Sequence, residues 1–473
     1  MELPPTGGKL SSAARLMRGA RQISHTLLFS TKEGNSVENT PLYDALTAFA
    51  AQNPLRLHMP GHKGKPLPGL DNLAAIDFTE LPPTGNLFEG GGAIGEAQAL
   101  WAELFRMDSC LFLTGGSTQG VLAALTLACQ PGDTVLLDRG SHRSAYNALA
   151  LLDLKPVYLD RPWLARAGVT GPISPERVEE QLEAHPEIKA LCITSPTYYG
   201  VLSDLPALAE VMHRHGGVLV VDGAHGAHLP FLGDYGLSEA DLLVASAHKT
   251  LPAPGQTALL FSNGAFSHAD LRREASIYGS SSPSYPMMAA LDLCRAHMLE
   301  GGTKAYRRTA EEVARLRECF PSLTEEDAPL DPTRLVLCAP DGYAAQEALE
   351  AQNVWPEMAD GGHVVLIPTC ADSRSDFARL EAALRQVALG PCPGYPAPTV
   401  PPEMALTPRQ ALFVPRKSLP LEQAEGQVAA CQVAPYPPGV PVIAPGERVD
   451  KKSIAYLKQI GYNTLEDVSV AVL

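Results

Sequence analysis

Short apolar runs alternate with helical stretches between about residues 97 and 249, and this alternation limits the possible folds more than any other feature of the sequence. The runs are TVLLD (134–138), KPVYLD (155–160), KALCITSP (189–196), GGVLVVDGAH (216–225) and ADLLVASAHK (240–249). Continuous Val, Leu and Ile runs separated by helices are typical of a mostly parallel sheet with helices on both faces. We therefore expect an α/β fold.

Two helices are expected before these runs. In residues 96–107, Leu100, Leu104 and Met107 have helical spacing and are expected to share one face. Residues 120–129 are apolar throughout and are expected to form a second, buried helix.

Polar side chains lie at or just after the ends of the expected strands or in tight turns. These are Ser117, His142, Thr197, Asp222 and Lys249. In open α/β sheets, ligands bind beyond the carboxyl ends of the strands. We therefore expect these residues, which are distant in sequence, to converge on one site.

Lys249 follows an apolar strand within the string Ser246-Ala247-His248-Lys249-Thr250. Burial lowers the pKa of a lysine, and Schiff-base chemistry requires a neutral amine. The alternative is a lysine at a strand end that reaches water. Asp222 ends another apolar run 27 residues earlier, a spacing that fits one crossover between neighbouring strands. It could cap a helix, or it could keep a cofactor's pyridine nitrogen protonated.

Glycines and hydroxyls precede the buried helix, in the string Gly115-Gly116-Ser117-Thr118. A helix N-terminus of this kind suits a phosphate, although it could also be a simple cap. It is not a P-loop, because the G-K-[ST] ending is missing. His142, in a turn, could stack on an aromatic cofactor or be structural. His225 and His228 do not form the H-E-x-x-H pattern of metal ligands.

Composition excludes several functional classes. The 473 residues exceed one ordinary domain of ~100–200 residues. A net charge of -15 argues against a nucleic-acid surface. No run approaches the ~18–20 apolar residues of a membrane helix. The nine cysteines include no C-x-x-C pair, so we expect reduced thiols in a cytoplasmic protein and no metal site.

Four segments are expected along the chain. Residues 1–36 are basic and contain serines, and a flexible tail is favoured over a transit peptide. Residues 37–305 would form a large cofactor-binding domain and residues 306–390 a smaller α+β domain. Residues 391–473 would form a Pro-rich linker and a C-terminal cap. The smaller domain is expected to use residues 305–319 as a helix and to have strands within 333–340 and 362–369.

Six strings, in this order, resemble those of the ornithine/lysine/arginine decarboxylase family, in its short form without the N-terminal wing domain. They are Leu57–Lys63, Ser195–Gly200, Asp222–His228, Ser246–Lys249, Ser282–Pro286, and Pro435–Pro441 with Pro445–Glu447. The resemblance runs from about Pro41 to Glu447. It implies a pyridoxal-phosphate (PLP) enzyme of fold type I, with an aspartate-aminotransferase-like large domain and a smaller C-terminal α+β domain. The implied reaction releases CO2 from an amino acid, foremost lysine, arginine or ornithine, and gives a polyamine-type amine.

The resemblance also implies a role for each matched residue. Lys249 would carry PLP as a Schiff base, Asp222 would pair with its pyridine nitrogen, His142 would stack on its ring, and His225 would lie near the ring. Further cofactor contacts would come from Gly116, Ser117, Thr118, Thr197, Ser246 and His248. Ser281 would reach the phosphate of a neighbouring subunit, which implies at least a homodimer with shared active sites.

Several positions depart from the family's pattern and leave alternatives open. Gly85 stands in place of an aspartate, Gly115 in place of an asparagine, and Gly223 and Cys431 in place of glutamates. The loss of these acidic residues argues against a basic substrate more strongly than it argues against PLP. Another PLP reaction on the same fold remains an alternative, such as that of an aminotransferase, lyase or racemase, as does a weakly active PLP-binding homologue with a regulatory role. A Rossmann dehydrogenase fits poorly, because no G-x-G-x-x-G follows a strand.

Overall fold

The computed structural model describes residues 48–65, 69–70, 73–394, 397, 401–435, 441–460 and 467–472. The chain divides into two compact units, Met1–Asn53 and Pro54–Leu473, and the elements below belong to the second. The expected tail, residues 1–36, lies outside the described residues, and so do residues 436–440 of the C-terminal string.

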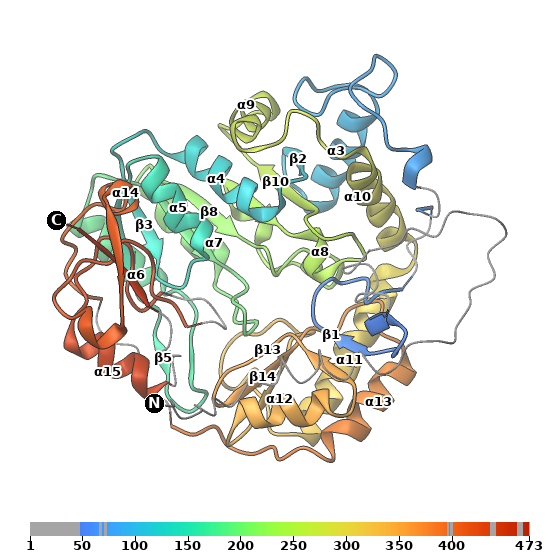
Figure 1. The fold of residues 1–473 in the computed structure, drawn as a ribbon. Coiled ribbons are helices and arrows are strands. Elements are labelled where there is room, and N and C mark those ends of the chain that lie inside the picture. The colour runs from blue at the N-terminus through green and yellow to red at the C-terminus, as the bar shows by residue number, and fades with distance from the viewer. Residues whose placement is uncertain are drawn as a thin grey trace, which may run out of the picture. The chain divides into compact units, whose positions relative to one another are not determined.

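A seven-stranded sheet forms the centre of the second unit, in the order β2-β10-β9-β8-β7-β3-β4 (Figure 1). Its strands are β2 (Ser109–Leu113), β3 (Thr134–Asp138), β4 (Lys155–Leu159), β7 (Ile188–Thr194), β8 (Val218–Asp222), β9 (Leu242–Ala245) and β10 (Ala258–Ser262). The pairs from β4 to β9 are all parallel, and β10 is antiparallel to both of its neighbours. The expectation of a mostly parallel sheet is confirmed.

The order of the strands explains why helices cover both faces. The chain steps outward from β3 to β4 and then back across β3 to β7 and β8. Because parallel crossovers are right-handed, the outward and the returning helices lie on opposite faces. The outward helix is α5 (Arg143–Leu151), and the returning helices are α6 (Pro175–Ala184) and α7 (Leu205–Arg214). Helix α4 (Gly116–Ala128) packs against α5 and against α9 (His268–Tyr278).

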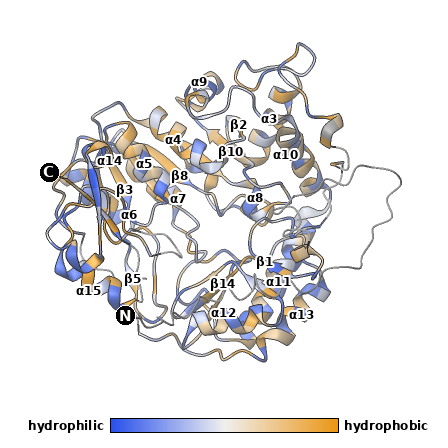
Figure 2. Ribbon diagram, in the orientation of Figure 1, coloured by the Kyte–Doolittle hydropathy of each residue, from blue (hydrophilic) through white to orange (hydrophobic). Residues whose placement is uncertain are grey.

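The central strands are apolar along their length because neither face meets water. All residues of β3, β9 and β10 are buried. Figure 2 shows this apolar character in the central strands and in α4, in contrast to the hydrophilic residues of α15 (Lys451–Gln459).

The first predicted helix is confirmed. The helix is α3 (Gly92–Phe105), and it buries Trp101 and Phe105, whereas Leu100 is 42% exposed. Apolar residues occur on more than one face of this segment, and burial follows the aromatic ones, which carry the larger apolar area.

A three-stranded antiparallel sheet, in the order β11-β14-β13, lies in the smaller domain. Its apolar core includes residues from α11, α12 and α13. The elements are α11 (Thr303–Cys319), β11 (Leu335–Cys338), α12 (Gly342–Glu350), β13 (Met358–Ala359), β14 (His363–Leu366) and α13 (Arg374–Leu384). The predicted helix at 305–319 and the two predicted strands are confirmed.

The strand β1 (Leu55–Leu57) also packs with the smaller domain. It pairs in parallel with β12 (Val354–Pro356), and its two leucines lie in the same core as α12 and α13. The start of the second unit is therefore joined to residues some 300 positions later. The predicted domain limits at residues 37, 305 and 390 stay predictions.

The C-terminal region has a core of its own. It contains α14 (Pro408–Phe413), η5 (Leu421–Gln423), α15 (Lys451–Gln459), and the antiparallel pair of β15 (Arg416–Leu419) and β16 (Val468–Ala471). A buried ion pair ties this region to the end of β3: the two guanidinium nitrogens of Arg139 lie 2.6 and 2.7 Å from the two carboxylate oxygens of Glu447.

The remaining elements connect these parts. They are η1 (Leu73–Ala75), β5 (Trp163–Leu164), β6 (Val169–Thr170), η2 (Leu229–Phe231), η3 (Leu237–Glu239), α8 (Ala247–Thr250), α10 (Tyr285–His297) and the π-helical η4 (Met298–Gly302). Within the described residues, no helix is both long enough and apolar enough to cross a membrane.

Candidate functional site

Lys249 lies in α8, a single helical turn that directly follows β9. Its Nζ is 3.0 Å from Nε2 of His225. Burial lowers the pKa of Lys249, and the charge of Arg334 acts in the same direction, while Asp222 and Glu357 oppose the shift. The structure thus favours the neutral amine at this position more than water would.

His225 is the closest titratable neighbour of that amine. The side chain is buried, and its Nδ1 has no hydrogen-bond partner in the described part of the chain. Burial is the main cause that holds the pKa of His225 well below its usual value, and the charge of Lys249 adds to it. The Tyr198 ring packs on the imidazole with ring centres 4.6 Å apart. His225 is therefore a neutral, fixed ring beside the lysine.

Asp222 is the last residue of β8 and is buried. It pairs in register with Val244 of β9, so the ends of these neighbouring strands bring Asp222 and the α8 turn together. Its Oδ1 accepts a hydrogen bond from the Ala224 N–H at 3.2 Å. Asp222 does not cap a long helix, because the chain continues here as a turn.

His142 is the N-cap of α5, and its Nδ1 accepts a hydrogen bond from the Ser144 N–H at 3.2 Å. Burial lowers the pKa of His142, while the charge of Asp222 raises it and that of Lys249 lowers it. His142, Asp222, His225 and Lys249 therefore lie within electrostatic range of one another, as the convergence of strand ends predicts.

Two groups suited to an anion lie at helix starts. Gly116, Ser117 and Thr118 form the first turn of α4, whose N-cap, Gly115, has no side chain to cap it; the Gly115 N–H donates to Oε1 of Gln119 at 3.0 Å. Ser246, the N-cap of α8, is fully buried, and its hydroxyl has no hydrogen-bond partner within the described residues. A buried hydroxyl without a partner is costly, so a ligand oxygen is its natural partner.

Three further residues are predicted to contact the cofactor: His248, Thr197 and Ser281. His248 donates from Nδ1 to the Thr257 carbonyl at 2.9 Å. Thr197 is buried after β7, and its hydroxyl accepts from the Val201 N–H at 3.1 Å. Ser281 lies in the exposed turn between α9 and α10, and among the described residues no hydrogen bond joins its side chain to the rest of the predicted set.

The string Leu57–Lys63 contributes by packing against α8. The Gly61 N–H donates to the His248 carbonyl at 2.8 Å. A Cβ at Gly61 would lie 2.5 Å from the Leu251 carbonyl oxygen, so only glycine allows this approach. The turn that carries Lys249 is thereby fixed from its far side.

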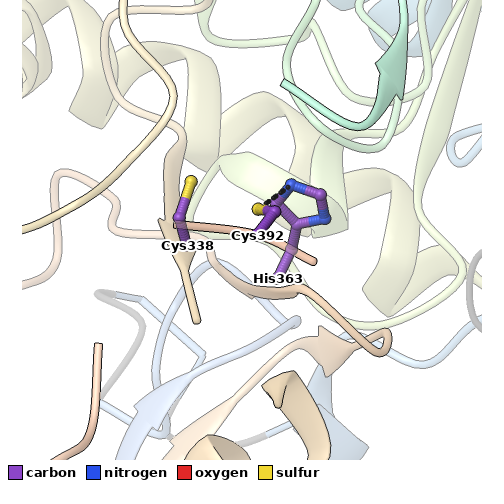
Figure 3. Close-up of side chains that lie close together, drawn as sticks. All are labelled: Cys338, His363 and Cys392. Carbon is purple, nitrogen blue, oxygen red and sulfur yellow. Dashed lines mark hydrogen bonds between the residues drawn. The ribbon is translucent and has the colours of Figure 1, made fainter. Parts of the chain in front are cut away.

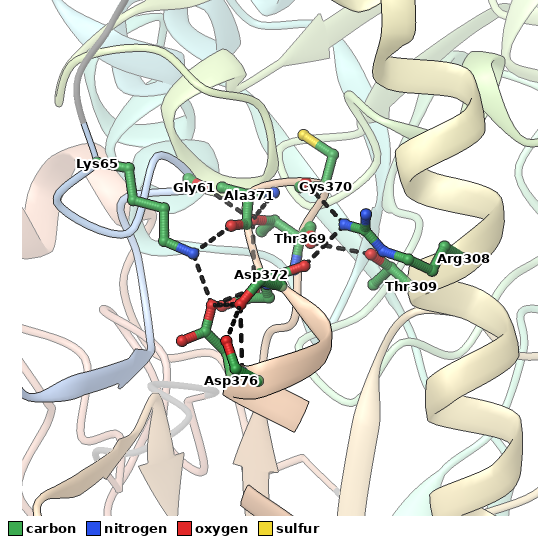
Figure 4. Close-up of polar contacts among 11 residues, drawn as sticks. Gly61, Lys65, Arg308, Thr309, Thr369, Cys370, Ala371, Asp372 and Asp376 are labelled. Carbon is green, nitrogen blue, oxygen red and sulfur yellow. Dashed lines mark hydrogen bonds and ion pairs between the residues drawn. The ribbon is translucent and has the colours of Figure 1, made fainter. Parts of the chain in front are cut away.

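Polar contacts hold this string in place (Figure 4). The Gly61 carbonyl accepts from the Thr369 hydroxyl at 2.8 Å, and Lys65 forms an ion pair with Asp376 at 2.6 Å. Arg308 of α11 donates to the Asp372 carbonyl at 2.8 Å. The turn between β14 and α13 therefore links α11 to the segment that supports α8.

One departure from the family pattern has a steric reason. A Cβ at Gly223 would lie 2.8 Å from Cδ1 of Leu243 and 3.2 Å from the Val244 carbonyl oxygen. A side chain at position 223 would therefore require the Leu243 side chain to move and the Val244 carbonyl to give way slightly.

Sequence reasoning missed Arg334 and Glu357. Arg334 is 1% exposed, and its guanidinium nitrogens make no hydrogen bond within the described residues; the nearest carboxylate oxygen, on Asp331, is 3.9 Å away. Glu357 accepts from the Met59 N–H at 2.9 Å and from the Tyr198 hydroxyl at 2.5 Å. The sequence signal that could have pointed to these two residues was that each is a charged residue next to an apolar run of the smaller domain.

The donor set fits the cofactor that the sequence predicts. A partly shielded amine beside a neutral imidazole suits a carbonyl, and the unpartnered Ser246 hydroxyl with the open start of α4 suits a phosphate. A carboxylate at the end of β8 and an imidazole at the start of α5 suit a protonated aromatic ring: the carboxylate would pair with the ring nitrogen and the imidazole would stack on the ring.

Comparison with protein families gives two matches. Residues 40–334 match the Orn/Lys/Arg decarboxylase major domain, and residues 396–464 match the Orn/Lys/Arg decarboxylase C-terminal domain. The uncharacterized protein YaaO of Bacillus subtilis is 34% identical over 456 residues, covering 89% of this chain and 94% of the relative. An arginine decarboxylase of Bacillus cereus is 29% identical over 446 residues, covering 86% and 96%.

Solved structures with the same fold include the lysine decarboxylase LdcF of Francisella novicida. It has a TM-score of 0.70 and 19% identity, with 93% of this chain and 79% of that chain covered. The alanine–glyoxylate aminotransferase of a Nostoc species has a TM-score of 0.51 and 18% identity, with 62% and 85% covered. These likenesses confirm the aspartate-aminotransferase-like fold.

Proposed function

Since this chain belongs to the Orn/Lys/Arg decarboxylase family, we propose that it is a PLP-dependent decarboxylase that converts a basic amino acid to an amine and CO2. The observation that carries the proposal is the Lys249 amine 3.0 Å from His225, with Asp222 at the end of the neighbouring strand. The named relatives include arginine and lysine decarboxylases, which supports a basic substrate.

Lys249 would hold the cofactor by its amine, and Asp222 would pair with the ring nitrogen. His142 would stack on the ring, His225 would lie near it, and Thr197 would contact the cofactor. Gly116, Ser117, Thr118, Ser246 and His248 would hold the phosphate. When bound, PLP supplies an electron sink for the pair left on the α-carbon as CO2 departs.

The chain's own residues would bind and orient the substrate. The buried Arg334 guanidinium makes no hydrogen bond within the described residues, and its ion pair with Asp331 is long, at 3.9 Å. The substrate carboxylate would give it a close, hydrogen-bonded partner. His225, held neutral by burial, would accept or return a proton at Nε2 as the Lys249 amine changes its charge. Arg334 and the Tyr198–His225 stack would thus fix the substrate relative to Lys249.

The protein would work as a cytoplasmic homodimer or larger homo-oligomer. Ser281 is exposed, as a role at the phosphate of a neighbouring subunit would require. Nucleic acid and membranes are not expected partners, given the net charge of -15.

We predict that the PLP-loaded protein releases CO2 and amine in equal amounts from lysine, arginine or ornithine. The measurement is parallel detection of both products over a panel of amino acids, without an α-ketoacid acceptor. Exchange that depends on an α-ketoacid would favour an aminotransferase instead. PLP binding without turnover of any panel member would favour the regulatory alternative.

A Ser246→Ala variant is expected to bind PLP more weakly by ~10–100-fold, because it removes a hydrogen bond of about 1.5–3 kcal/mol to a charged group. The measurement is titration of cofactor-free protein, followed by the absorbance of the bound cofactor. Ser276→Ala is the matched control, because that hydroxyl is exposed and donates only to the Arg273 carbonyl within its own helix. Equal affinity of the Ser246 variant and the parent would contradict the phosphate role.

A further inference from the structure

Cys338, His363 and Cys392 bring three metal-ligating atoms together in the smaller domain (Figure 3). Cys338 ends β11 and is paired in register with His363, the first residue of β14. Opposed residues of an antiparallel pair point to the same face, with Cβ atoms about 4.5–5.5 Å apart. Cys392 follows α13, and its Sγ is 3.0 Å from Nε2 of His363. The three ligand atoms lie within 4.8 Å of one another.

His363 is oriented by a carboxylate on its other side. The side chain is fully buried, and its Nδ1 lies 3.1 and 3.2 Å from the two oxygens of Asp360. Asp360 also accepts hydrogen bonds from the Gly362 N–H at 2.8 Å and from the Tyr199 hydroxyl at 2.5 Å. A proton held on Nδ1 by Asp360 leaves Nε2, which lies beside Cys392, to bind a metal once it loses its own proton, and this is the usual arrangement around a metal-bound histidine.

The atoms that face Nε2 are all electron-rich. The Ala167 carbonyl oxygen is 2.8 Å from Nε2, and the Cys392 sulfur also lies 3.1 Å from the Gly362 carbonyl oxygen. These sulfur, nitrogen and oxygen atoms would coordinate a cation that displaces the protons between them.

We propose that Cys338, His363 and Cys392 bind a zinc ion, with a water molecule or the Ala167 carbonyl in the fourth position. Zn–S bonds of about 2.3 Å and Zn–N bonds of about 2.0–2.1 Å place tetrahedral ligand atoms roughly 3.4–3.8 Å apart. The observed cluster reaches this geometry with small side-chain movements. Two thiolates and an imidazole select zinc over magnesium or calcium.

The ion would join the segment after α13 to the β11–β14 pair, and its role would be structural. This site is separate from the proposed decarboxylation. The proposed zinc site contradicts the sequence-based expectation of no metal site. That expectation rested on the absence of ligands close together in the sequence. Here the ligands are 25 and 29 residues apart, and strand pairing brings the first two together.

The test is zinc stoichiometry of the full-length chain. The protein is reduced, stripped with a chelator, incubated with ZnCl2, desalted, and measured by elemental analysis. We expect one zinc per chain, with loss of that zinc in Cys338→Ser and in Cys392→Ser. Cys319→Ser is the matched control, because Cys319 is exposed and outside the cluster, and it should keep the metal. Asp360→Asn should weaken zinc binding by ~10–100-fold, as the loss of an outer-shell partner does.

A second measurement protects the test from variants that fail to fold. The unaltered chain, stripped and loaded with Co2+, should show thiolate-to-cobalt charge-transfer absorption in the near ultraviolet. Absence of that band, zinc retained in both cysteine variants, or a reduced chain that takes up no zinc would each overturn the proposal. The last result would leave the cluster as an imidazolium–thiolate pair. If the purified chain carries a Cys338–Cys392 disulfide and takes up no zinc even after that bond is reduced, the proposal would be overturned as well.

Discussion

Lys249→Ala is expected to lower decarboxylation by at least ~10²–10⁴-fold, the range for loss of a positioned catalytic group. The variant removes the amine that lies 3.0 Å from His225 and leaves in place the groups of α4 and α8 that are proposed to bind the phosphate. PLP should therefore still bind, but its absorption spectrum should change because it is no longer attached to the protein. The measurements are CO2 release and the visible spectrum of the loaded variant.

Lys249→Arg separates attachment from charge. Arginine keeps the positive charge but does not lose its proton in proteins, so this variant should be as inactive as the alanine variant. Lys304→Ala is the control, because Lys304 lies exposed on α11. Activity of the Lys249 variants within tenfold of the parent would show that Lys249 does not carry the chemistry.

The convergence of the site could be predicted from the sequence because it depends on strand ends. The string TVLLD gives the bounds of β3 because both faces of that strand are covered, and its apolar run ends where the chain leaves the sheet. Asp222 and Lys249 follow neighbouring strands, so parallel pairing alone brings them to one edge. Their roles stay predictions until they are tested by substitution.

Other features could not be predicted because they depend on contacts between distant segments. The run of β10 is as apolar as its neighbours, and periodicity does not show that it runs antiparallel. Arg334 and Glu357 reach the site from the smaller domain, and nothing near them in sequence indicates this. The Cys338, His363 and Cys392 cluster depends on strand register in the same way.

Asp138→Ala is expected to destabilise the protein by about 3–5 kcal/mol, because it leaves a buried arginine without its counter-charge. Asp138 is 0% exposed, and its carboxylate accepts from Arg161 Nη2 at 2.7 Å, from the Gly140 N–H at 2.8 Å and from the Thr194 N–H at 3.1 Å. These bonds hold the ends of β3 and β7 together, four residues before His142. The measurement is the denaturant dependence of unfolding.

Two comparisons isolate the buried charge as the cause. An Asp138→Leu, Arg161→Met double variant removes both charges and should recover much of the lost stability, because apolar replacement of a buried ion pair is often neutral. Arg177→Ala breaks an exposed pair with Glu180 and should change stability by less than about 1 kcal/mol. A loss below about 1 kcal/mol in Asp138→Ala would mean that water reaches Arg161 when its partner is removed. Since His142 follows this turn directly, the Asp138 variant should also bind PLP more weakly, whereas the Arg177 variant should not.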